Sequence, residues 1–215
     1  EAARQALDRA GVSASELDLI VVATATPDTL IPSTACYLQK QLGCVAPAMD
    51  VNAACSGFVY GLVTAAQFVK TGCSRRALVV GADLMSRTVN PDDKKTYPLF
   101  GDGAGATILA PGDDDQGLIA YTLGADGNGS NLLCIPGGGS RLPLDANALA
   151  AGRQYLSMDG KPVFKWAVRL VADSIRDVLR QAGLQASDIS HAVLHQANRR
   201  ILDAAFKSLD FGPEQ

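Results

Sequence analysis

The hydrophobic and polar positions of the chain fall into two recurring patterns, continuous apolar runs and amphipathic segments. The first segment predicts a helix over residues 2–10 that ends at Gly11, and the apolar run LDLIVVA predicts a buried strand over residues 17–23. Further helices are predicted at residues 33–42, 57–70, 162–182 and 199–209, and further strands at 48–51, 77–80, 104–110, 118–123 and 192–195. This order predicts an α/β protein with a largely parallel sheet.

One helix, turn and strand pattern occurs twice. Residues 6–26 align with residues 178–198 without a gap, and seven of the 21 positions are identical. Both copies predict a helix, a glycine stop, a turn and a buried strand. A duplicated architecture is the favoured interpretation, with halves at residues 1–112 and 113–215. Chance similarity of one amphipathic unit stays open as the alternative.

Composition narrows the function classes. The 215 residues include 19 Lys and Arg against 22 Asp and Glu, a net charge of −3, which argues against a general nucleic-acid binder. With 47% hydrophobic and 19% charged residues the chain is not disordered. It shows neither an apolar run of about 20 residues, as a membrane span needs, nor a secretory segment at its start. Five cysteines without a CxxC pair, and two histidines beside none of them, predict free thiols in the cytoplasm and no structural zinc.

Cys55 is the strongest candidate for chemistry. It lies in DVNAACSGFVYG, between a predicted strand and a predicted helix. The helix dipole and the unpaired N–H groups at such a site favour the thiolate, so the sequence predicts a lowered thiol pKa and a nucleophile. A small buried residue is the alternative. Packing roles are expected for the remaining cysteines, Cys36, Cys44, Cys73 and Cys134.

His195 is the second candidate, at the end of a predicted strand. Ligands bind at that end of strands in α/β sheets, and a histidine there can act as acid, base or hydrogen-bond donor. A structural histidine is the alternative, and His191, at the strand start, is expected to be structural. The glycine motif at residues 101–106, GDGAGA, lacks the Lys-Ser/Thr of a phosphate loop and predicts a tight turn into a strand.

Three motifs, DVNAACSGF, LFGDGAGATIL and VLHQANRRI, in this order and spacing resemble β-ketoacyl-acyl-carrier-protein synthase III. This family of condensing enzymes initiates bacterial type II fatty acid synthesis and belongs to the thiolase superfamily. The resemblance runs along the whole chain. It implies a five-layer αβαβα sandwich of two similar halves, here incomplete, and a cytoplasmic homodimer. It also implies that the family's third catalytic residue, an Asn, lies beyond Gln215, and that CoA-binding segments precede Glu1.

The resemblance also implies a role for individual residues. Cys55 matches the nucleophile that accepts an acyl group from acyl-CoA, and His195 matches the histidine that assists decarboxylation of malonyl-acyl-carrier protein. Acyl-CoA is then a substrate, and no metal or redox cofactor is expected. Positions matching substrate or CoA contacts are Lys94, Phe164, Asn198, Arg200 and Ile31. Lys94 stands where many members carry Arg, so it keeps the charge and loses the planar stacking surface.

One side of the predicted helix at residues 162–182 is basic. An acyl-carrier protein is acidic, so an acidic synthase needs a local basic surface. The residues expected to bind the carrier protein are Lys165, Arg200 and Lys207, with Lys161 and Arg169 close to them. The alternative is a solvated helix face with ion pairs such as Arg169 to Asp173.

The expected reaction has two steps. An acyl group moves from acyl-CoA to Cys55, and a decarboxylative Claisen condensation with malonyl-acyl-carrier protein follows. Two alternatives stay open at this point. One is a synthase III-like enzyme of secondary-metabolite or polyketide assembly, and the other is a non-catalytic fragment that binds the carrier protein.

Overall fold

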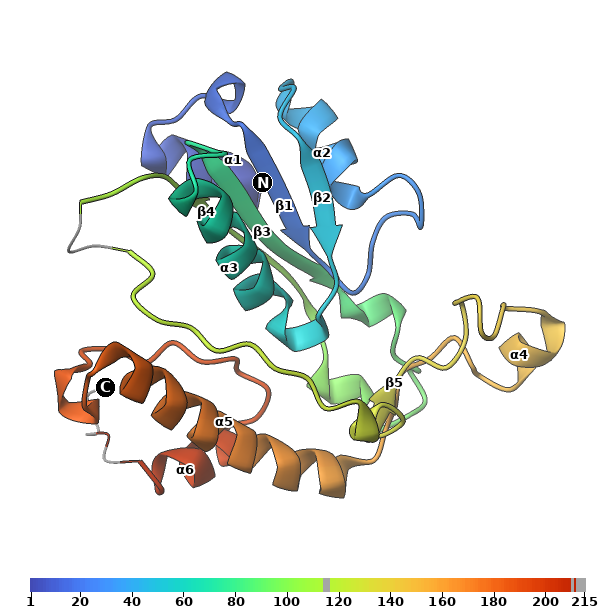
Figure 1. Ribbon diagram of the computed structural model, residues 1–215. Helices are drawn as coiled ribbons and strands as arrows, with labels where there is room; N and C mark the ends of the chain where they lie inside the picture. The colour runs from blue at the N-terminus through green and yellow to red at the C-terminus, as the bar shows by residue number, and fades with distance from the viewer. Residues whose placement is uncertain (114–116, 210, 212–215) are drawn as a thin grey trace. The chain divides into compact units, whose positions relative to one another are not determined.

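The computed structural model describes residues 1–113, 117–209 and 211, and the chain forms two compact units (Figure 1). Unit 1 comprises Glu1–Met85 and Gly101–Leu118, and unit 2 comprises Ser86–Phe100 and Ile119–Gln215. The division of the sequence at residues 112 and 113 stays a prediction. No helix of the described residues is long and apolar enough to cross a membrane.

Unit 1 is built on a four-stranded sheet in the order β2-β1-β3-β4. Its strands are β1 (Leu19–Ala23), β2 (Ala48–Val51), β3 (Ala77–Leu84) and β4 (Asp102–Leu109). The first three are parallel to one another, and β4 is antiparallel to β3. Its helices are α1 (Ala2–Ala10), α2 (Thr34–Leu42) and α3 (Gly57–Lys70). The largely parallel sheet predicted from the apolar runs is confirmed.

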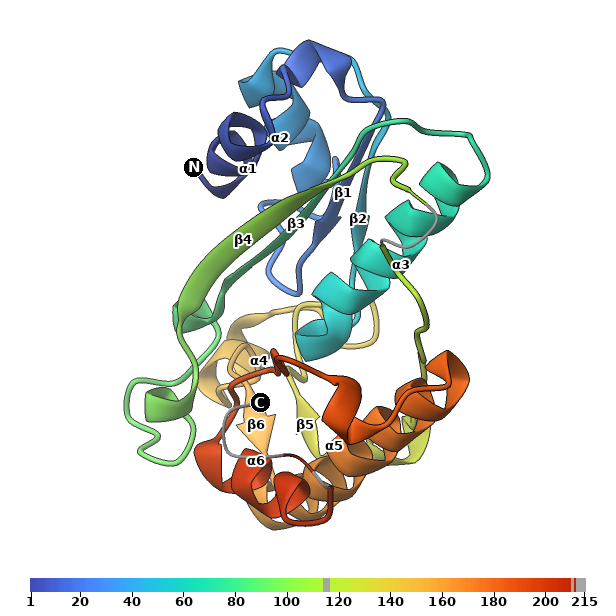
Figure 2. The same cartoon turned by 90° about the vertical axis from the view of Figure 1, so that its left-hand side faces the viewer.

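The two faces of the sheet hold separate apolar clusters, because side chains along a strand alternate between faces. Ile20, Leu78 and their neighbours pack with α1 and α2, whereas Val21, Val79 and their neighbours pack with Ala65 of α3. Figure 2 shows α3 on one side of the strands and α1 and α2 on the other. Strands covered on both faces read as continuous apolar runs, which is why LDLIVVA was recognisable in the sequence.

Unit 2 is mainly helical. It contains α4 (Ala146–Ala150), α5 (Gly160–Ala182), α6 (Arg199–Phe206) and a pair of two-residue antiparallel strands, β5 (Leu133–Cys134) and β6 (Ser157–Met158). α6 packs against α5. The repeat is visible at the helix ends, since α1 and α5 both stop at a left-handed glycine, Gly11 at φ 62° and Gly183 at φ 69°. A short 3₁₀ turn with a capping box follows in both copies.

Two predicted strands are wrong. Residues 118–123 and 192–195 form no strand in the structure. The copy that does form a strand, β1, pairs with β2 on one side and β3 on the other. Neither of the two segments pairs with a strand within the described residues, and an apolar run without a neighbouring strand has no ladder to join.

Candidate functional site

Cys55 lies in a tight connection between β2 and α3. Ala54, Cys55 and Ser56 form a 3₁₀ turn, and α3 begins at the next residue, Gly57. Ala54 has φ 46°, the one positive φ at a non-glycine residue in the described part of the chain. A left-handed alanine costs about 1–2 kcal/mol, so the surrounding structure holds this turn in place. The turn places Cys55 at the start of the helix, as predicted, and the residue is exposed there.

Small residues allow α3 to approach the sheet closely at this point. A Cβ atom on Gly57 would stand 3.4 Å from the Cβ of Ala23, at the end of β1. One turn later, a Cβ on Gly61 would stand 3.4 Å from Cγ1 of both Val21 and Val79. The glycines therefore set the spacing between the sheet and the helix that carries the nucleophile at its start.

Gly61 gives a test of this spacing. Gly61→Leu is expected to lower the free energy of unfolding by about 1–3 kcal/mol, because the larger side chain has no room against the sheet. It should also slow modification of Cys55, because α3 must move outward. Gly61→Ala is the matched control, since its Cβ makes ordinary contacts and alanine favours the helix by about 0.5–1 kcal/mol. Urea unfolding and alkylation rates compare the two variants; equal behaviour would contradict the argument.

A hydrogen-bonded turn lies at the same edge of the sheet. It consists of Thr24, Ala25 and Thr26, directly after β1, and is called the 24–26 turn below. Oδ1 of Asp83, near the end of β3, accepts from the backbone N–H of Ala25 at 2.7 Å, from Oγ1 of Thr24 at 3.3 Å and from Oγ1 of Thr26 at 3.5 Å. Asp83 is not among the site residues predicted from the sequence. The one signal for it was a carboxylate directly after a buried apolar run.

The pKa of the Cys55 thiol is raised above its ordinary value, so the predicted lowering is wrong for this chain. Desolvation of the thiol is the largest cause, although the residue as a whole is exposed, and the Asp83 carboxylate is the second. A hydrogen bond with the residue's own backbone lowers the pKa but is outweighed. Partial burial and a nearby negative charge both disfavour a thiolate, and the helix start does not compensate for them.

The remaining residues of the predicted site are divided between the units. Ile31 shares unit 1 with Cys55 and lies in the loop before α2, with 88% of its surface exposed. The others belong to unit 2: Lys94, Phe164, Lys165, His195, Asn198, Arg200 and Lys207. The structure therefore describes the predicted nucleophile and the predicted histidine in separate units, and their roles stay predictions.

In unit 2, His195 is exposed in an irregular segment that leads into α6. Asn198 caps that helix, since its Oδ1 accepts the backbone N–H of Arg200 at 2.9 Å. This fixes the start of α6 at Arg199, four residues after His195. Phe164 is half-buried on α5. The predicted channel contacts of Phe164, Asn198 and Arg200 are not tested by this geometry.

Lys94 lies in a loop organised by its neighbour Asp93. The Asp93 carboxylate accepts from Thr96 Oγ1 at 2.7 Å and from the backbone N–H of Lys95 at 2.9 Å. The hydrogen bond from Thr96 is the main reason that the pKa of Asp93 is lowered. Thr96 itself is buried, so the loop is anchored and the Lys94 side chain is left exposed.

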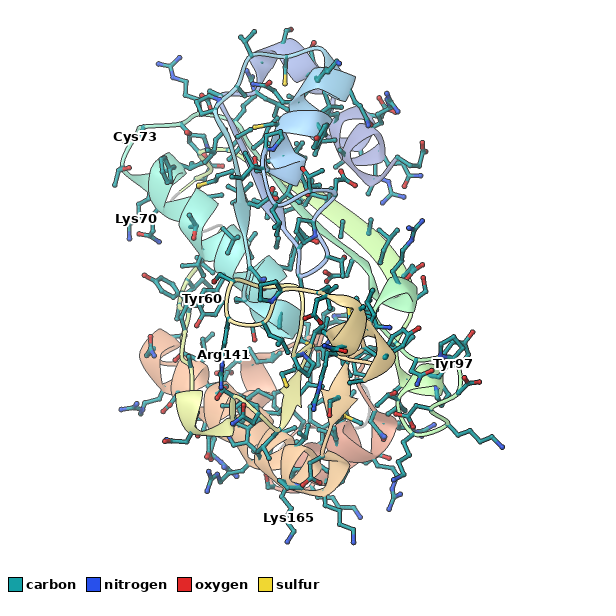
Figure 3. The ribbon with its side chains drawn as sticks, turned by 90° about the vertical axis from the view of Figure 1, so that its right-hand side faces the viewer. Tyr60, Lys70, Cys73, Tyr97, Arg141 and Lys165 are labelled. Carbon is teal, nitrogen blue, oxygen red and sulfur yellow. The ribbon has the colours of Figure 1, made fainter. Side chains whose placement is uncertain are left out.

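The ion pair between Arg169 and Asp173, which was the alternative explanation for the basic side of α5, does not form. Asp173 pairs with Arg176 at 3.2 Å, not with Arg169. Lys165 is exposed and extends away from α5 (Figure 3), and Arg169 is exposed as well. Within the described residues, none of the five basic side chains considered above forms an ion pair. These are Lys161, Lys165, Arg169, Arg200 and Lys207.

The other cysteines agree with the expectation of free thiols, and all five are unpaired. Cys36 Sγ lies 3.2 Å from Ser33 Oγ, and Cys44 Sγ lies 3.8 Å from the Gln39 carbonyl. Cys73 is exposed beyond the far end of α3 (Figure 3), so the packing role expected for it is wrong. No group of three or more His, Cys, Asp or Glu side chains in the described part of the chain could hold a metal ion.

Comparison with known proteins decides the family. The model of 3-oxoacyl-[acyl-carrier-protein (ACP)] synthase III matches residues 49–127, and the model of its C-terminal part matches residues 179–215. A β-ketoacyl-[acyl-carrier-protein] synthase III from Rhodopirellula baltica is 53% identical over the whole chain, which spans 68% of that relative. The chain belongs to the β-ketoacyl-[acyl-carrier-protein] synthase III family.

Two solved structures agree with this assignment. The enzyme from Pseudomonas aeruginosa PAO1 matches 98% of the chain with 42% identity and a TM-score of 0.87, and the chain spans 63% of it. A priming β-ketosynthase from the R1128 polyketide biosynthetic pathway matches 99% of the chain with 35% identity and a TM-score of 0.86, and the chain again spans 63% of it. The predicted family and the α/β thiolase-like fold class are confirmed. The chain spans 63–68% of the length of these three proteins.

Proposed function

We propose that this chain carries the acyl-accepting site of an acyltransferase that initiates type II fatty acid synthesis. In the first step the Cys55 thiolate attacks the thioester carbonyl of acyl-CoA, and the CoA thiolate leaves. In the second step malonyl-acyl-carrier protein loses CO2. The resulting carbanion attacks the acyl thioester on Cys55, forms β-ketoacyl-acyl-carrier protein and releases the Cys55 thiolate.

The observation that carries this proposal is the placement of Cys55. Family membership alone does not show that a nucleophile is presented, whereas the 3₁₀ turn before α3 leaves Cys55 exposed at a helix start. Backbone N–H groups at such a position can donate to the oxyanion of a thioester adduct. Under this proposal His195 assists decarboxylation, and Lys94, Phe164, Asn198, Arg200 and Ile31 contact acyl-CoA. We also propose a cytoplasmic homodimer, because the family resemblance implies one.

Intact-mass spectrometry after incubation with acetyl-CoA tests the first step. A mass increase of one acetyl group, mapped to the peptide that contains Cys55, is the expected result. Subsequent addition of malonyl-acyl-carrier protein should remove the adduct and yield acetoacetyl-carrier protein. Binding of the carrier protein without any adduct would support the non-catalytic alternative instead. Polyketide assembly is a weaker candidate, and transfer only to another acceptor would favour it.

The basic side chains of unit 2 suggest how the acidic carrier protein binds. Lys165→Glu combined with Lys207→Glu is expected to slow condensation with malonyl-acyl-carrier protein by on the order of tenfold, because complementary charge speeds encounter. Acetylation by acetyl-CoA should be unaffected. Lys40→Glu with Lys70→Glu is the matched control, with the same charge change in unit 1. Carrier-protein turnover at several salt concentrations measures the effect, and equal losses in both double variants would contradict it.

A further inference from the structure

Asp83 is a carboxylate beside the nucleophile to which neither the family resemblance nor the proposed reaction gives a role. Along β3, Ala77 and Val79 face α3 and belong to the same cluster as Ala65 of that helix. Alternation along the strand places Asp83, four residues after Val79, on this same face. The start of α3 reaches the same edge of the sheet, where a Cβ on Gly81 would stand 3.2 Å from the Phe58 ring.

Hydrogen bonds connect the Asp83 carboxylate to the turn after β1 and, through that turn, to the end of β2. Asp83 accepts three hydrogen bonds from the 24–26 turn. The turn is tied back to β3, because the backbone N–H of Leu84 donates to Thr26 Oγ1 at 2.8 Å. It is tied to β2 as well, because the backbone N–H of Thr24 donates to the Val51 carbonyl at 3.1 Å. Val51 is the last residue of the strand that leads to Cys55.

We propose that Asp83 is a positioning residue of the acyl-accepting site: it fixes the 24–26 turn at the sheet edge where β2 leads to Cys55, and it places one negative charge on the sheet face that α3 covers. This inference rests on the proposed function of Cys55. Desolvation is the main reason that the pKa of the thiol is raised, and the Asp83 charge raises it further, so both favour the protonated thiol over the thiolate. Asp83 thereby limits the reactivity of the nucleophile while it holds the surrounding backbone in shape.

The other ionisable side chains on the surrounding elements act differently. The β1 strand has none. Asp50 of β2 accepts from the backbone N–H groups of Thr34 and Ala35 and so faces α2, on the opposite side of the sheet. On α3, Lys70 lies at the far end from Cys55, about 20 Å along the helix axis, and Tyr60 lies in the first turn of the helix (Figure 3). Asp102 of β4 pairs in register with Leu84, one position further along than Asp83.

The test is the pH profile of Cys55 alkylation by iodoacetamide, read by peptide mass spectrometry. Asp83→Asn keeps the size of the side chain and an acceptor oxygen but removes the charge. We expect the midpoint of its Cys55 profile to move to lower pH, with several-fold faster alkylation at pH 7. Asp83→Glu restores the charge and should return the midpoint toward the wild-type value. The profile of Cys73, in the same sample, should not change.

Asp18 supplies a matched control. Its carboxylate accepts from the backbone N–H groups of Arg75 and Arg76, at the opposite end of the same pair of strands. Asp18→Asn should therefore leave the Cys55 profile unchanged. An unchanged midpoint in Asp83→Asn, or an equal shift in Asp18→Asn, overturns the proposal. The readout needs no acetyl-CoA, so a wild-type protein that takes no acetyl group would refute the proposed function and leave this test intact.

Discussion

Cys55→Ala should reduce acetylation by acetyl-CoA by on the order of a thousandfold or more, to the level of the uncatalysed background. The thioester carbonyl then has no nucleophile at the start of α3, and the remaining backbone donors cannot accept an acyl group. Because Cys55 is exposed, the same change should alter the free energy of unfolding by no more than about 0.5 kcal/mol. Loss of the adduct would therefore report chemistry and not unfolding.

Cys73→Ala is the control for this experiment. Cys73 is also exposed but lies beyond the other end of α3, after Thr71. It has no helix start to stabilise an oxyanion, so its removal should leave acetylation at the wild-type level. An adduct that persists in Cys55→Ala and disappears in Cys73→Ala would show that Cys73, and not Cys55, is the nucleophile.

The pattern of the sequence was sufficient for β1 and the first half of β3, because these residues are buried on both faces of the sheet. A run such as LDLIVVA predicts a strand at almost the correct limits, since the apolar length and the glycine and proline breaks on either side mark it. Helix ends were equally readable, because Gly11 and Gly183 occupy the left-handed position that ends α1 and α5. These features depend on residues that are adjacent in the sequence, so they can be predicted from the sequence alone.

The predictions that were wrong depend on contacts between residues that are far apart in the sequence. Residues 192–195 have the same pattern as β1, but a strand also needs a neighbour, and pairing partners are set by the tertiary structure. Similarly, the position of Cys55 at a helix start was predicted correctly, whereas the direction of its pKa shift was not. That direction depends first on the desolvation of the thiol and second on Asp83, which lies 28 residues away in the sequence and is placed near the start of α3 by the register of β3.

Leu78→Ala is expected to lower the free energy of unfolding by about 2–5 kcal/mol, the second large effect. Leu78 is fully buried in β3, in register with Ile20 of β1 and Ile108 of β4. It lies in the cluster that joins the sheet to α1 and α2, including Leu7. Removal of its isobutyl group leaves a cavity that strands paired on both sides cannot close.

Urea unfolding followed by far-ultraviolet circular dichroism measures the effect of Leu78→Ala. Val45→Ala, in the loop before β2, is the control from the same unit, because Val45 is 94% exposed and should contribute less than about 0.5 kcal/mol. A domain is stable by only about 5–15 kcal/mol, so Leu78→Ala removes a large part of the margin that keeps β3, Asp83 and the start of α3 in place. Acetylation of Cys55 should therefore be lost at lower urea concentrations in this variant than in Val45→Ala. Equal unfolding midpoints in the two variants would show that the α1 and α2 face of the sheet is not the stabilising core.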